Sequence, residues 1–286
     1  RDGRAHVANR AAANAYLATR LPATYAAVRA SLGMAMEHLP GFVPRSLLDV
    51  GAGPGTAFFA ATDCFPELAS VTLVEASAAM RAAGAALADA LDLGPRWIAA
   101  DATAGLSDAP SADLVTLAYV LDELEPASRQ RLVARLWEVC EGVLVIVEPG
   151  TPAGWRRVLA ARDILVGRGA CLVAPCPHAL ACPVAPPDWC HFAERLPRSR
   201  LHRQSKGADA PFEDEKFSFL AAARNPAEAY AARVLARPRN GSGRVQLKLC
   251  DADGALSRKL VTRRDGDAFR MARRLDWGDP MEALPG

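Results

Sequence analysis

The sequence predicts an α/β protein built on a parallel, doubly wound sheet, and three observations lead to this prediction. Short apolar strand patterns alternate with helical patterns up to residue 150. A glycine-rich turn directly follows the first of these strands, at residues 51–55. A loop rich in cysteine and proline, residues 171–192, then separates this alternating part from a tail of short strand patterns. Strands that alternate with helices are typical of α/β folds with a parallel sheet.

The composition is that of an ordinary globular chain, with 286 residues of which 51% are hydrophobic and 23% charged. No apolar run reaches the ~18 residues that a membrane span needs, so we expect no membrane partner. The net charge is only +2, but it is unevenly distributed. Residues 191–275 hold 19 of the 34 Lys and Arg residues and only 10 of the 32 Asp and Glu residues. A basic last part indicates a module that binds a polyanion.

The first segment, residues 1–45, is predicted to be helical. It is rich in Ala, and large apolar side chains recur every three to four residues in it: Leu21, Tyr25, Val28, Leu32 and Met36. This spacing gives a helix one apolar face for packing. Pro44 ends the helical region.

A strand, a glycine turn and a helix follow one another in SLLDVGAGPGTAFFAA, residues 46–61. The turn contains Gly51, Gly53 and Gly55, directly after a short buried strand. Glycines let the backbone pass close to a ligand, and the start of the next helix supplies free N–H groups. The sequence therefore predicts a nucleotide-binding turn at this place.

Three carboxylates accompany the turn. Asp49 lies in the end of the first strand, and Glu75 ends the second strand pattern, about 20 residues past the loop, where a carboxylate binds ribose hydroxyls. Asp101 ends the third strand pattern, residues 96–103, where an adenine would lie. The order D-x-G-x-G-x-G, then Glu, then Asp resembles that of the class I S-adenosylmethionine-dependent methyltransferases. The resemblance implies that S-adenosylmethionine is bound by Asp49, Gly51, Gly53, Gly55, Glu75 and Asp101.

Two other interpretations of the turn stay open. A nicotinamide or flavin domain would more often show G-x-G-x-x-G, whereas residue 56 is Thr. A fold of this class that has lost its ligand would keep the same glycines. A helix at 127–140 and a fifth strand at 142–150 complete the alternation, so we place a class I methyltransferase-like domain at 46–165.

Candidate catalytic residues are few. The fourth strand pattern, residues 113–124, ends near Tyr119, and Asp122 and Glu123 follow at the edge of the sheet where ligands bind. We weigh equally the interpretation that the two acids only place negative charge in the first turn of a helix. No Asn/Asp-Pro-Pro-aromatic box or nearby Pro-Cys nucleophile is present. Positioning alone can transfer a sulfonium methyl group, so this absence does not exclude an enzyme.

The loop at 171–192 holds four of the seven cysteines and five prolines. Thiols crowded into an irregular loop indicate a metal site or disulfides. Disulfides are disfavoured because the number of cysteines is odd, no secretory signal is visible, and a chain of this length can build its core without them. Gaps of five and seven residues separate Cys176, Cys182 and Cys190, unlike the paired C-x2-C of common zinc sites. The spacing modestly favours an iron–sulfur cluster and leaves zinc as the alternative.

A basic segment completes the region 166–210. The stretch 195–207 contains five Arg and Lys residues and no acid, and we predict phosphate contacts with RNA for four of them: Arg198, Arg200, Arg203 and Lys206. A solvated basic segment is the simpler alternative. The acidic run at 213–215 is expected to neutralise part of this charge.

The last region, residues 211–286, is predicted to be a small, basic, β-rich domain that begins with a strand at 216–224. Strand patterns at 231–239 and 244–250 flank Asn240-Gly241-Ser242-Gly243, a typical hairpin turn. A further strand at 256–264 and a closing helix at 266–275 follow.

Ten motifs carry a second resemblance, which covers nearly the whole chain. They are LLDVGAGPGT at 47–56, VLDEL at 120–124, EPGTPAGW at 148–155, APCPH at 174–178, CP at 182–183, DWCHF at 188–192, HRQSKG at 202–207, EDEKFSFLAAAR at 213–224, LKLC at 247–250 and RDG at 264–266. With them the chain resembles the methyltransferase-like proteins of the mitochondrial small ribosomal subunit and their bacterial homologues. The cysteine block is the most specific part of this resemblance.

The resemblance implies a [4Fe-4S] cluster on Cys176, Cys182, Cys190 and Cys250, three from the loop and one from the later strand. Cys171 departs from the family pattern, and Cys64 and Cys140 are interpreted as small core residues. The implied partners are the small ribosomal subunit and its ribosomal RNA, in assembly or translation. The chain would methylate this RNA, bind it without modifying it, or act as a redox or iron sensor. We expect a monomer, cytoplasmic in a bacterium and mitochondrial in a eukaryote.

Overall fold

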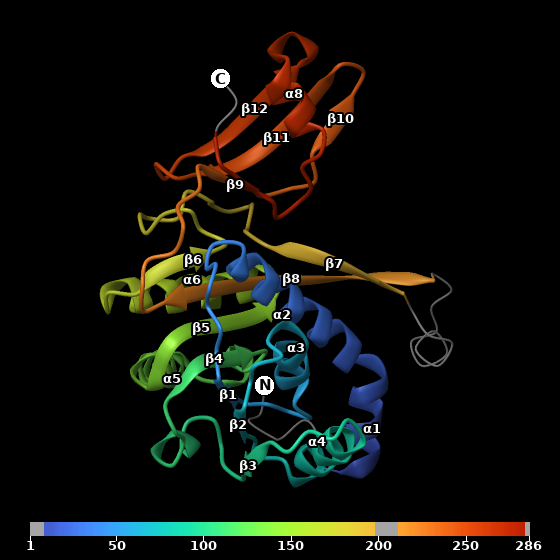
Figure 1. The fold of residues 1–286 in the computed structure, drawn as a ribbon, viewed down its shortest axis with the longest axis vertical. Helices are drawn as coiled ribbons and strands as arrows, with labels where there is room; N and C mark the ends of the chain where they lie inside the picture. The colour runs from blue at the N-terminus through green and yellow to red at the C-terminus, as the bar shows by residue number, and fades with distance from the viewer. Residues whose placement is uncertain (1–8, 198–210, 284–286) are drawn as a thin grey trace.

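Two β-sheets organise the computed structural model, which describes residues 9–197 and 211–283 (Figure 1). The larger sheet begins with five strands: β1 (Ser46–Val50), β2 (Ser70–Val74), β3 (Arg96–Ile98), β4 (Ala112–Ala118) and β5 (Cys140–Pro149). They pair in parallel in the order β3-β2-β1-β4-β5. The order reverses between β1 and β4, and ligands of doubly wound sheets bind at the carboxyl ends of the strands near such a reversal. The structure thus confirms the predicted α/β sheet.

Helices cover both faces of this sheet. They are α1 (Arg10–Thr19), α2 (Leu21–Met36), α3 (Thr56–Cys64), α4 (Ala78–Ala90), α5 (Pro126–Val139) and α6 (Pro152–Gly167). Successive residues of β5 point to opposite faces: Val143 and Val145 join a core with α2 and α3, and Leu144 and Ile146 join a core with α5 and α6. Strands buried on both faces read as continuous apolar runs, which is why the sequence revealed them.

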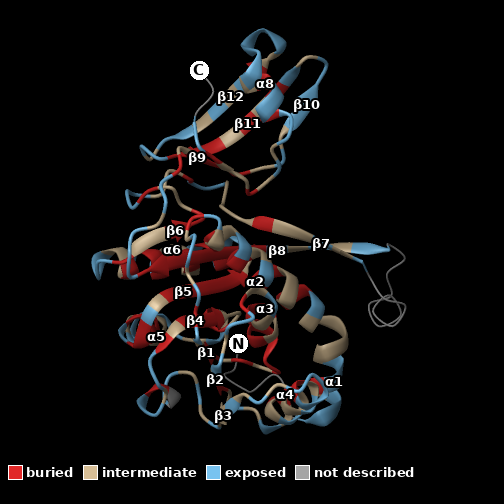
Figure 2. Cartoon of the chain, in the orientation of Figure 1, coloured by how far each residue is buried: buried red, intermediate tan, exposed pale blue. Residues whose placement is uncertain are grey.

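Three further strands extend the larger sheet: β6 (Cys171–Ala174), β7 (Phe192–Pro197) and β8 (Phe212–Ala223). Strand β8 pairs antiparallel with β5, and both β6 and β7 pair with β8. The sequence-based boundary placed residues from 211 onward in the C-terminal domain, whereas β8 lies in the large sheet. The reason is its apolar run 217–223, which is buried throughout and needs a core on both faces (Figure 2).

The smaller sheet stands above the larger one in Figure 1. Its strands are β9 (Ala232–Val234), β10 (Arg239–Gly241), β11 (Arg244–Asp251), β12 (Leu256–Thr262) and β13 (Pro280–Met281). The predicted hairpin joins β10 to β11, with Gly243 at a φ of +72° in the turn. The predicted closing helix is α8 (Asp267–Ala272), whose Phe269 shares a core with Val245, Leu247 and Leu249 of β11.

The described residues also form three short 3-10 turns: η1 (Gly105–Ser107), η2 (Leu121–Glu123) and η3 (Arg263–Asp265). The cysteine-rich loop runs between the two sheets, in yellow in Figure 1. Within residues 9–197 and 211–283, we find no helix with the length and apolarity that a bilayer span requires.

Candidate functional site

The glycine turn lies at the carboxyl end of β1, and its three glycines all have positive φ, +67° at Gly51, +57° at Gly53 and +85° at Gly55. Residues other than glycine rarely adopt a backbone conformation with positive φ. A Cβ on Gly51 would lie 2.3 Å from Cγ2 of Val120, so the close packing of the turn requires glycine there. A Cβ on Gly53 would meet no heavy atom within 4 Å. Gly53 therefore borders open space, where a ligand can approach the backbone.

Helix α3 begins directly after this turn, and Gly55 caps it without a side-chain hydrogen bond. The N–H groups of the first turn and the helix dipole favour a negative group at this end. The hydroxyl of Thr56 is buried beside them and has no hydrogen-bond partner among the described residues. These donors suit an anionic group such as the carboxylate of an amino-acid-like ligand.

Glu75 follows β2 at the same edge of the sheet. Its Oε2 accepts a hydrogen bond from the Gly53 N–H at 2.9 Å, and its Oε1 accepts one from the Ser77 N–H at 2.7 Å. A carboxylate has about four acceptor positions, so positions remain for ligand hydroxyls. The structure thus brings Glu75 and the glycine turn together, as a ribose-binding role requires.

Asp49 and Asp101 differ from Glu75 in their surroundings. Asp49 is enclosed in β1, where its Oδ1 accepts a hydrogen bond from the Thr116 hydroxyl at 2.8 Å. Burial raises the pKa of Asp49 to about 7, although the Thr116 bond opposes this shift. Asp101 is exposed after β3, and its Oδ1 accepts hydrogen bonds from the N–H and hydroxyl of Thr103. The Asp49 side chain therefore supports the turn from inside the sheet, and the Asp101 carboxylate is hydrogen-bonded within its own loop.

Tyr119 follows β4 with a φ of +61°, a rare conformation for an aromatic residue. Its hydroxyl donates a hydrogen bond to Oε1 of Glu215 at 3.0 Å, and Arg20 donates to the same oxygen at 3.3 Å. Burial raises the pKa of Tyr119 well above its usual value, and the Glu215 carboxylate adds to this shift. Sequence reasoning did not place Arg20 or Glu215 beside Tyr119, because these residues reach it from the start of α2 and from β8, far away along the chain.

Asp122 and Glu123 lie in η2, the 3-10 turn after Tyr119. Arg157 of α6 pairs with Oδ1 of Asp122 at 2.9 Å and with Oε2 of Glu148 at 2.6 Å. Glu148 is fully buried, and it also accepts a hydrogen bond from the Leu121 N–H. The carboxylate of Asp122 is therefore part of an ion-pair network that ties β5, α6 and η2 together.

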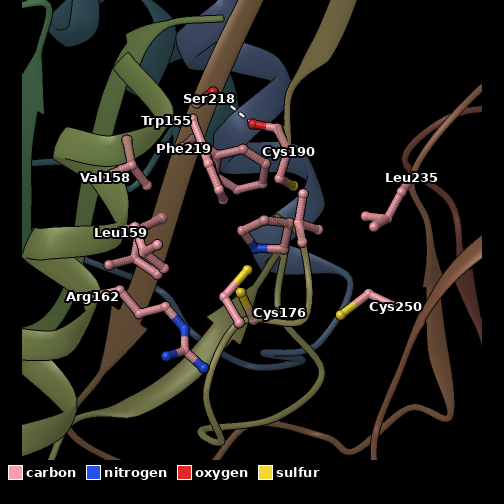
Figure 3. A pocket seen from close by; sticks show the side chains of 14 residues that line it. Trp155, Val158, Leu159, Arg162, Cys176, Cys190, Ser218, Phe219, Leu235 and Cys250 are labelled. Atoms are coloured by element: carbon pink, nitrogen blue, oxygen red, sulfur yellow. Dashed lines mark hydrogen bonds between the residues drawn. The ribbon is translucent and has the colours of Figure 1, made fainter. Parts of the chain in front are cut away.

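The cysteine-rich loop and the smaller sheet meet at a cavity of about 30 Å³ (Figure 3). Cys176, Cys182 and Cys190 line it from the loop, and Cys250 lines it from β11. Its other walls are mostly apolar and come from α6, β8 and the chain around Leu235. Figure 3 shows the sulfur atoms of Cys176 and Cys250 on facing sides of this space.

Thiol sulfur is the donor that zinc and iron–sulfur clusters prefer, so the four side chains fit such a group. Burial raises the pKa of all four thiols, that of Cys250 to about 12 and that of Cys190 well above its usual value. Neighbouring thiols add to the shifts of Cys190 and Cys250, which places the four groups within electrostatic reach of one another. In the part of the chain that the structure describes, no three metal-binding side chains are spaced to share one ion, so the centre stays a prediction.

The remaining cysteines lie elsewhere. Cys171 is in β6, opposite Ala223 of β8, and is not among the residues that line the cavity. Cys140 is buried in the core on the α5 side, and Cys64 packs against the other core. All seven cysteines are free thiols.

The four arginines and lysines predicted to contact RNA, residues 198, 200, 203 and 206, lie outside the described residues. The neighbouring Arg195 forms a bidentate pair with Asp214, at 2.7 and 2.9 Å, across β7 and β8. This pair agrees with the expectation that the acidic run neutralises part of the basic segment. In the smaller sheet the register places Arg244, Lys248 and Arg258 on one side of β11 and β12, where Lys248 pairs with Asp188.

Comparisons with known proteins cover most of the chain. It is 32% identical to the mitochondrial ribosome assembly protein METTL17 of Homo sapiens, over 94% of this chain and 62% of that protein. It is 27% identical to the mitochondrial Rsm22-cox11 tandem protein 2 of Schizosaccharomyces pombe, over 83% of this chain and 39% of that protein. The chain thus spans less than two thirds of the length of these curated relatives.

Solved methyltransferases align with a part of the chain. The magnesium protoporphyrin IX methyltransferase of Synechocystis PCC 6803 aligns with a TM-score of 0.47 and 14% identity, over 71% of this chain and 80% of that chain. The precorrin-6y C5,15-methyltransferase of Geobacter metallireducens aligns with a TM-score of 0.46 and 15% identity, over 68% and 88%. The family model described as "Mitochondrial small ribosomal subunit Rsm22" matches residues 10–282. This match confirms the resemblance that the sequence motifs predicted, and the chain belongs to the Rsm22 family.

Proposed function

We propose that this chain is an assembly protein of the small ribosomal subunit that binds ribosomal RNA, S-adenosylmethionine and a four-cysteine metal centre. The observation that carries the proposal is the cavity that three loop cysteines share with Cys250 of the smaller sheet. A metal there would bind the two sheets to each other and present them to RNA as one surface. Membership of the Rsm22 family and the similarity to the ribosome assembly protein METTL17 support the ribosomal role.

S-adenosylmethionine fits the glycine turn. Gly53 leaves room for a ligand, the start of α3 offers donors to its carboxylate, and Glu75 can accept hydrogen bonds from its ribose. When bound, this cofactor supplies an activated methyl group. The chain's own residues would hold it by the turn, the helix start and the carboxylate.

At the cysteine cavity we favour a [4Fe-4S] cluster over zinc. Zinc needs four ligands that meet at one ion, whereas a cluster takes each thiolate on a different iron. The four cysteines line one cavity, and gaps of five and seven residues separate the three loop cysteines, unlike the paired C-x2-C of common zinc sites. This spacing supports the cluster. A cluster would supply electron-transfer capacity and a covalent link between Cys250 and the loop.

A binding role is better supported than methyl transfer. The Tyr119 hydroxyl already donates to Glu215, and Asp122 is paired with Arg157. Both groups would have to leave these partners before they could act on a methyl acceptor. Methylation of small-subunit RNA is the alternative function. The mitochondrial names of the relatives support a mitochondrial location for eukaryotic members, with the cytoplasm as the counterpart in a bacterium.

The proposal is tested by crosslinking the protein to small-subunit RNA, followed by a methyl-transfer assay with labelled S-adenosylmethionine on the crosslinked fragment. We expect a crosslink at a defined rRNA site and no incorporation of label. Incorporation at that site would establish the enzymatic alternative. A protein that crosslinks to no rRNA would contradict the ribosomal role.

The electrostatic part of RNA binding has its own control. If about six phosphates are neutralised, affinity falls by about 10³ or more between 50 and 200 mM salt. Replacing Arg200, Arg203 and Lys206 by Ala should weaken binding to every RNA sequence and reduce this salt dependence. The matched control removes three exposed arginines from α5 and the end of α6: Arg131, Arg135 and Arg168. Equal losses of RNA affinity in the two triple variants would contradict a specific role of the 198–206 segment.

A further inference from the structure

A buried arginine stands in the wall of the cysteine cavity. Arg162 of α6 is 3% exposed and lines the cavity together with Cys176 and Cys182 (Figure 3). It continues a stripe on one face of the helix, since Trp155, Val158 and Leu159 precede it at helical spacing and line the same cavity. An apolar side chain would extend this stripe without a desolvation penalty, whereas an uncompensated guanidinium is strongly destabilising when it is buried.

The contacts of Arg162 satisfy part of its hydrogen-bonding capacity but leave its charge uncompensated. Its Nη2 donates to the carbonyl oxygens of His178, at 3.0 Å, and Leu180, at 2.5 Å. Its Nη1 lies 3.6 Å from Oδ1 of Asp163, whose side chain is 70% exposed, so solvent screens that pair. Its Nε–H is buried and has no hydrogen-bond partner among the described residues. A buried cation with a free donor indicates that an anionic group belongs beside it.

We propose that Arg162 is the counter-cation of an anionic metal–thiolate centre in this cavity. The inference rests on the proposed metal centre and deepens it, because it names a residue that sets the charge of the site. Four thiolates carry four negative charges, and Zn²⁺ or a [4Fe-4S]²⁺ core supplies two positive charges, so the centre retains a net charge of about −2 in either case. The fixed charge of Arg162 offsets half of it. Arg162 also holds the loop between two of the ligands, through the carbonyls of His178 and Leu180.

Two variants separate charge from loop anchoring. Arg162→Lys keeps the charge and loses the planar donor fork, whereas Arg162→Gln keeps hydrogen-bonding atoms and loses the charge. Both proteins are purified anaerobically and reconstituted with iron and sulfide, and in parallel with zinc. The rate of metal release to a chelator is measured for either metal, and the midpoint potential is measured for the iron form.

The charge role predicts that Arg162→Gln releases metal faster by on the order of tenfold, the usual cost of removing an outer partner of a metal site. It also predicts a more negative midpoint potential, because the reduced centre carries more negative charge and loses its compensating cation. Arg162→Lys should release metal at a rate within about threefold of the wild-type rate. Two variants that release metal equally fast at an unchanged potential would overturn the inference and show that Arg162 only anchors the loop.

Arg157→Gln is the matched control. Arg157 lies on the same helix and is nearly as buried, but Glu148 neutralises it and it does not line the cavity. We expect wild-type release and potential from this variant, and a shift equal to that of Arg162→Gln would overturn the inference. If circular dichroism shows that Arg162→Gln does not fold, the test rests on Arg162→Lys alone. Metal release from Arg162→Lys at the wild-type rate would support the charge role, and faster release would overturn it. A wild type that binds neither metal would instead overturn the metal centre itself, a result distinct from the others.

Discussion

The glycine turn and the cysteine cavity are assembled in different ways. The turn is local: Gly51, Gly53 and Gly55 take their conformations within five residues, and Glu75 reaches them from the neighbouring strand. The cavity is non-local, since its thiols come from a loop and from Cys250 in a second sheet. A local site depends on backbone conformation, whereas the cavity depends on how the two sheets are held together. Substitutions at the two sites should therefore fail in different ways.

The largest effect is expected from Cys250→Ser. Loss of this proposed ligand would open the proposed centre and remove the link between the loop and β11, so bound metal should fall by at least tenfold and the smaller sheet should lose stability. Iron, sulfide and visible absorption of anaerobically purified protein measure the first effect, and proteolysis of the tail measures the second.

Cys171→Ser is the control for this change, because Cys171 lies in β6 and does not line the cavity. It should keep the metal. Loss of metal from Cys171→Ser, with retention by Cys250→Ser, would move the fourth ligand to Cys171. If the purified protein contains one equivalent of zinc and shows no visible absorption, the centre is a zinc site and not an iron–sulfur cluster. The assignment of the four thiols as ligands would be unaffected.

At the glycine turn, Gly53→Arg should abolish binding of S-adenosylmethionine in calorimetry. The new side chain would extend into the open space beside Gly53, where the ligand is expected. Its positive φ adds a conformational cost of about 1–2 kcal/mol.

Gly41→Arg separates these two causes. Gly41 also has a positive φ, +91°, and open space around its Cβ position, but it lies before β1 and away from the turn. The Gly41→Arg variant should lose a similar amount of unfolding free energy and keep its full affinity for S-adenosylmethionine. If the wild type binds no ligand below millimolar concentration, the turn no longer serves a cofactor.

The local and the non-local parts of the molecule also differ in how well they can be predicted from the sequence. The glycine turn, Glu75 and the alternation of strands and helices are local patterns, so their positions could be predicted. The long strand β8 could not be assigned to its sheet, because nothing in a strand pattern states which neighbour it pairs with. Arg233 shows the same limit. It belongs to a basic tail, yet it is fully buried, where it donates to the Gly278 carbonyl and pairs with Glu37.

A third prediction concerns pH and the support beneath the glycine turn. Burial raises the pKa of Asp49 from 3.8 to about 7 in the folded protein. The folded state therefore holds a proton that the unfolded state has lost between these values, so stability falls as pH rises from about 4 to 7. At 1.36 kcal/mol per unit, the full difference is roughly 4 kcal/mol.

Asp49→Asn removes this titration and keeps a side-chain oxygen for the Thr116 hydroxyl. Urea unfolding at several pH values should show a flatter profile for the variant than for the wild type. Parallel profiles would contradict the raised pKa and would indicate that Asp49 is ionised at neutral pH inside the sheet.

The smallest effect is expected from a single hydroxyl at the edge of the cysteine cavity. Ser218 of β8 is buried, and its Oγ donates a hydrogen bond to the carbonyl of Cys190 at 2.8 Å. Ser31 of α2 also donates to a backbone carbonyl, that of Ala27 one turn earlier in its own helix, at 2.8 Å, and it does not line the cavity. Replacing either serine by Ala should cost about 1 kcal/mol of unfolding free energy in the metal-free protein.

The two variants should differ once metal is bound. Ser218→Ala frees the backbone of Cys190, so metal release to a chelator should accelerate by a few-fold, less than on loss of a ligand. Ser31→Ala should release metal at the wild-type rate. Because the two changes remove the same group at equal burial, a difference in release isolates what β8 contributes to the cavity. Equal release would mean that the four thiols hold their centre without help from the large sheet, and that the loop and β11 alone define the site.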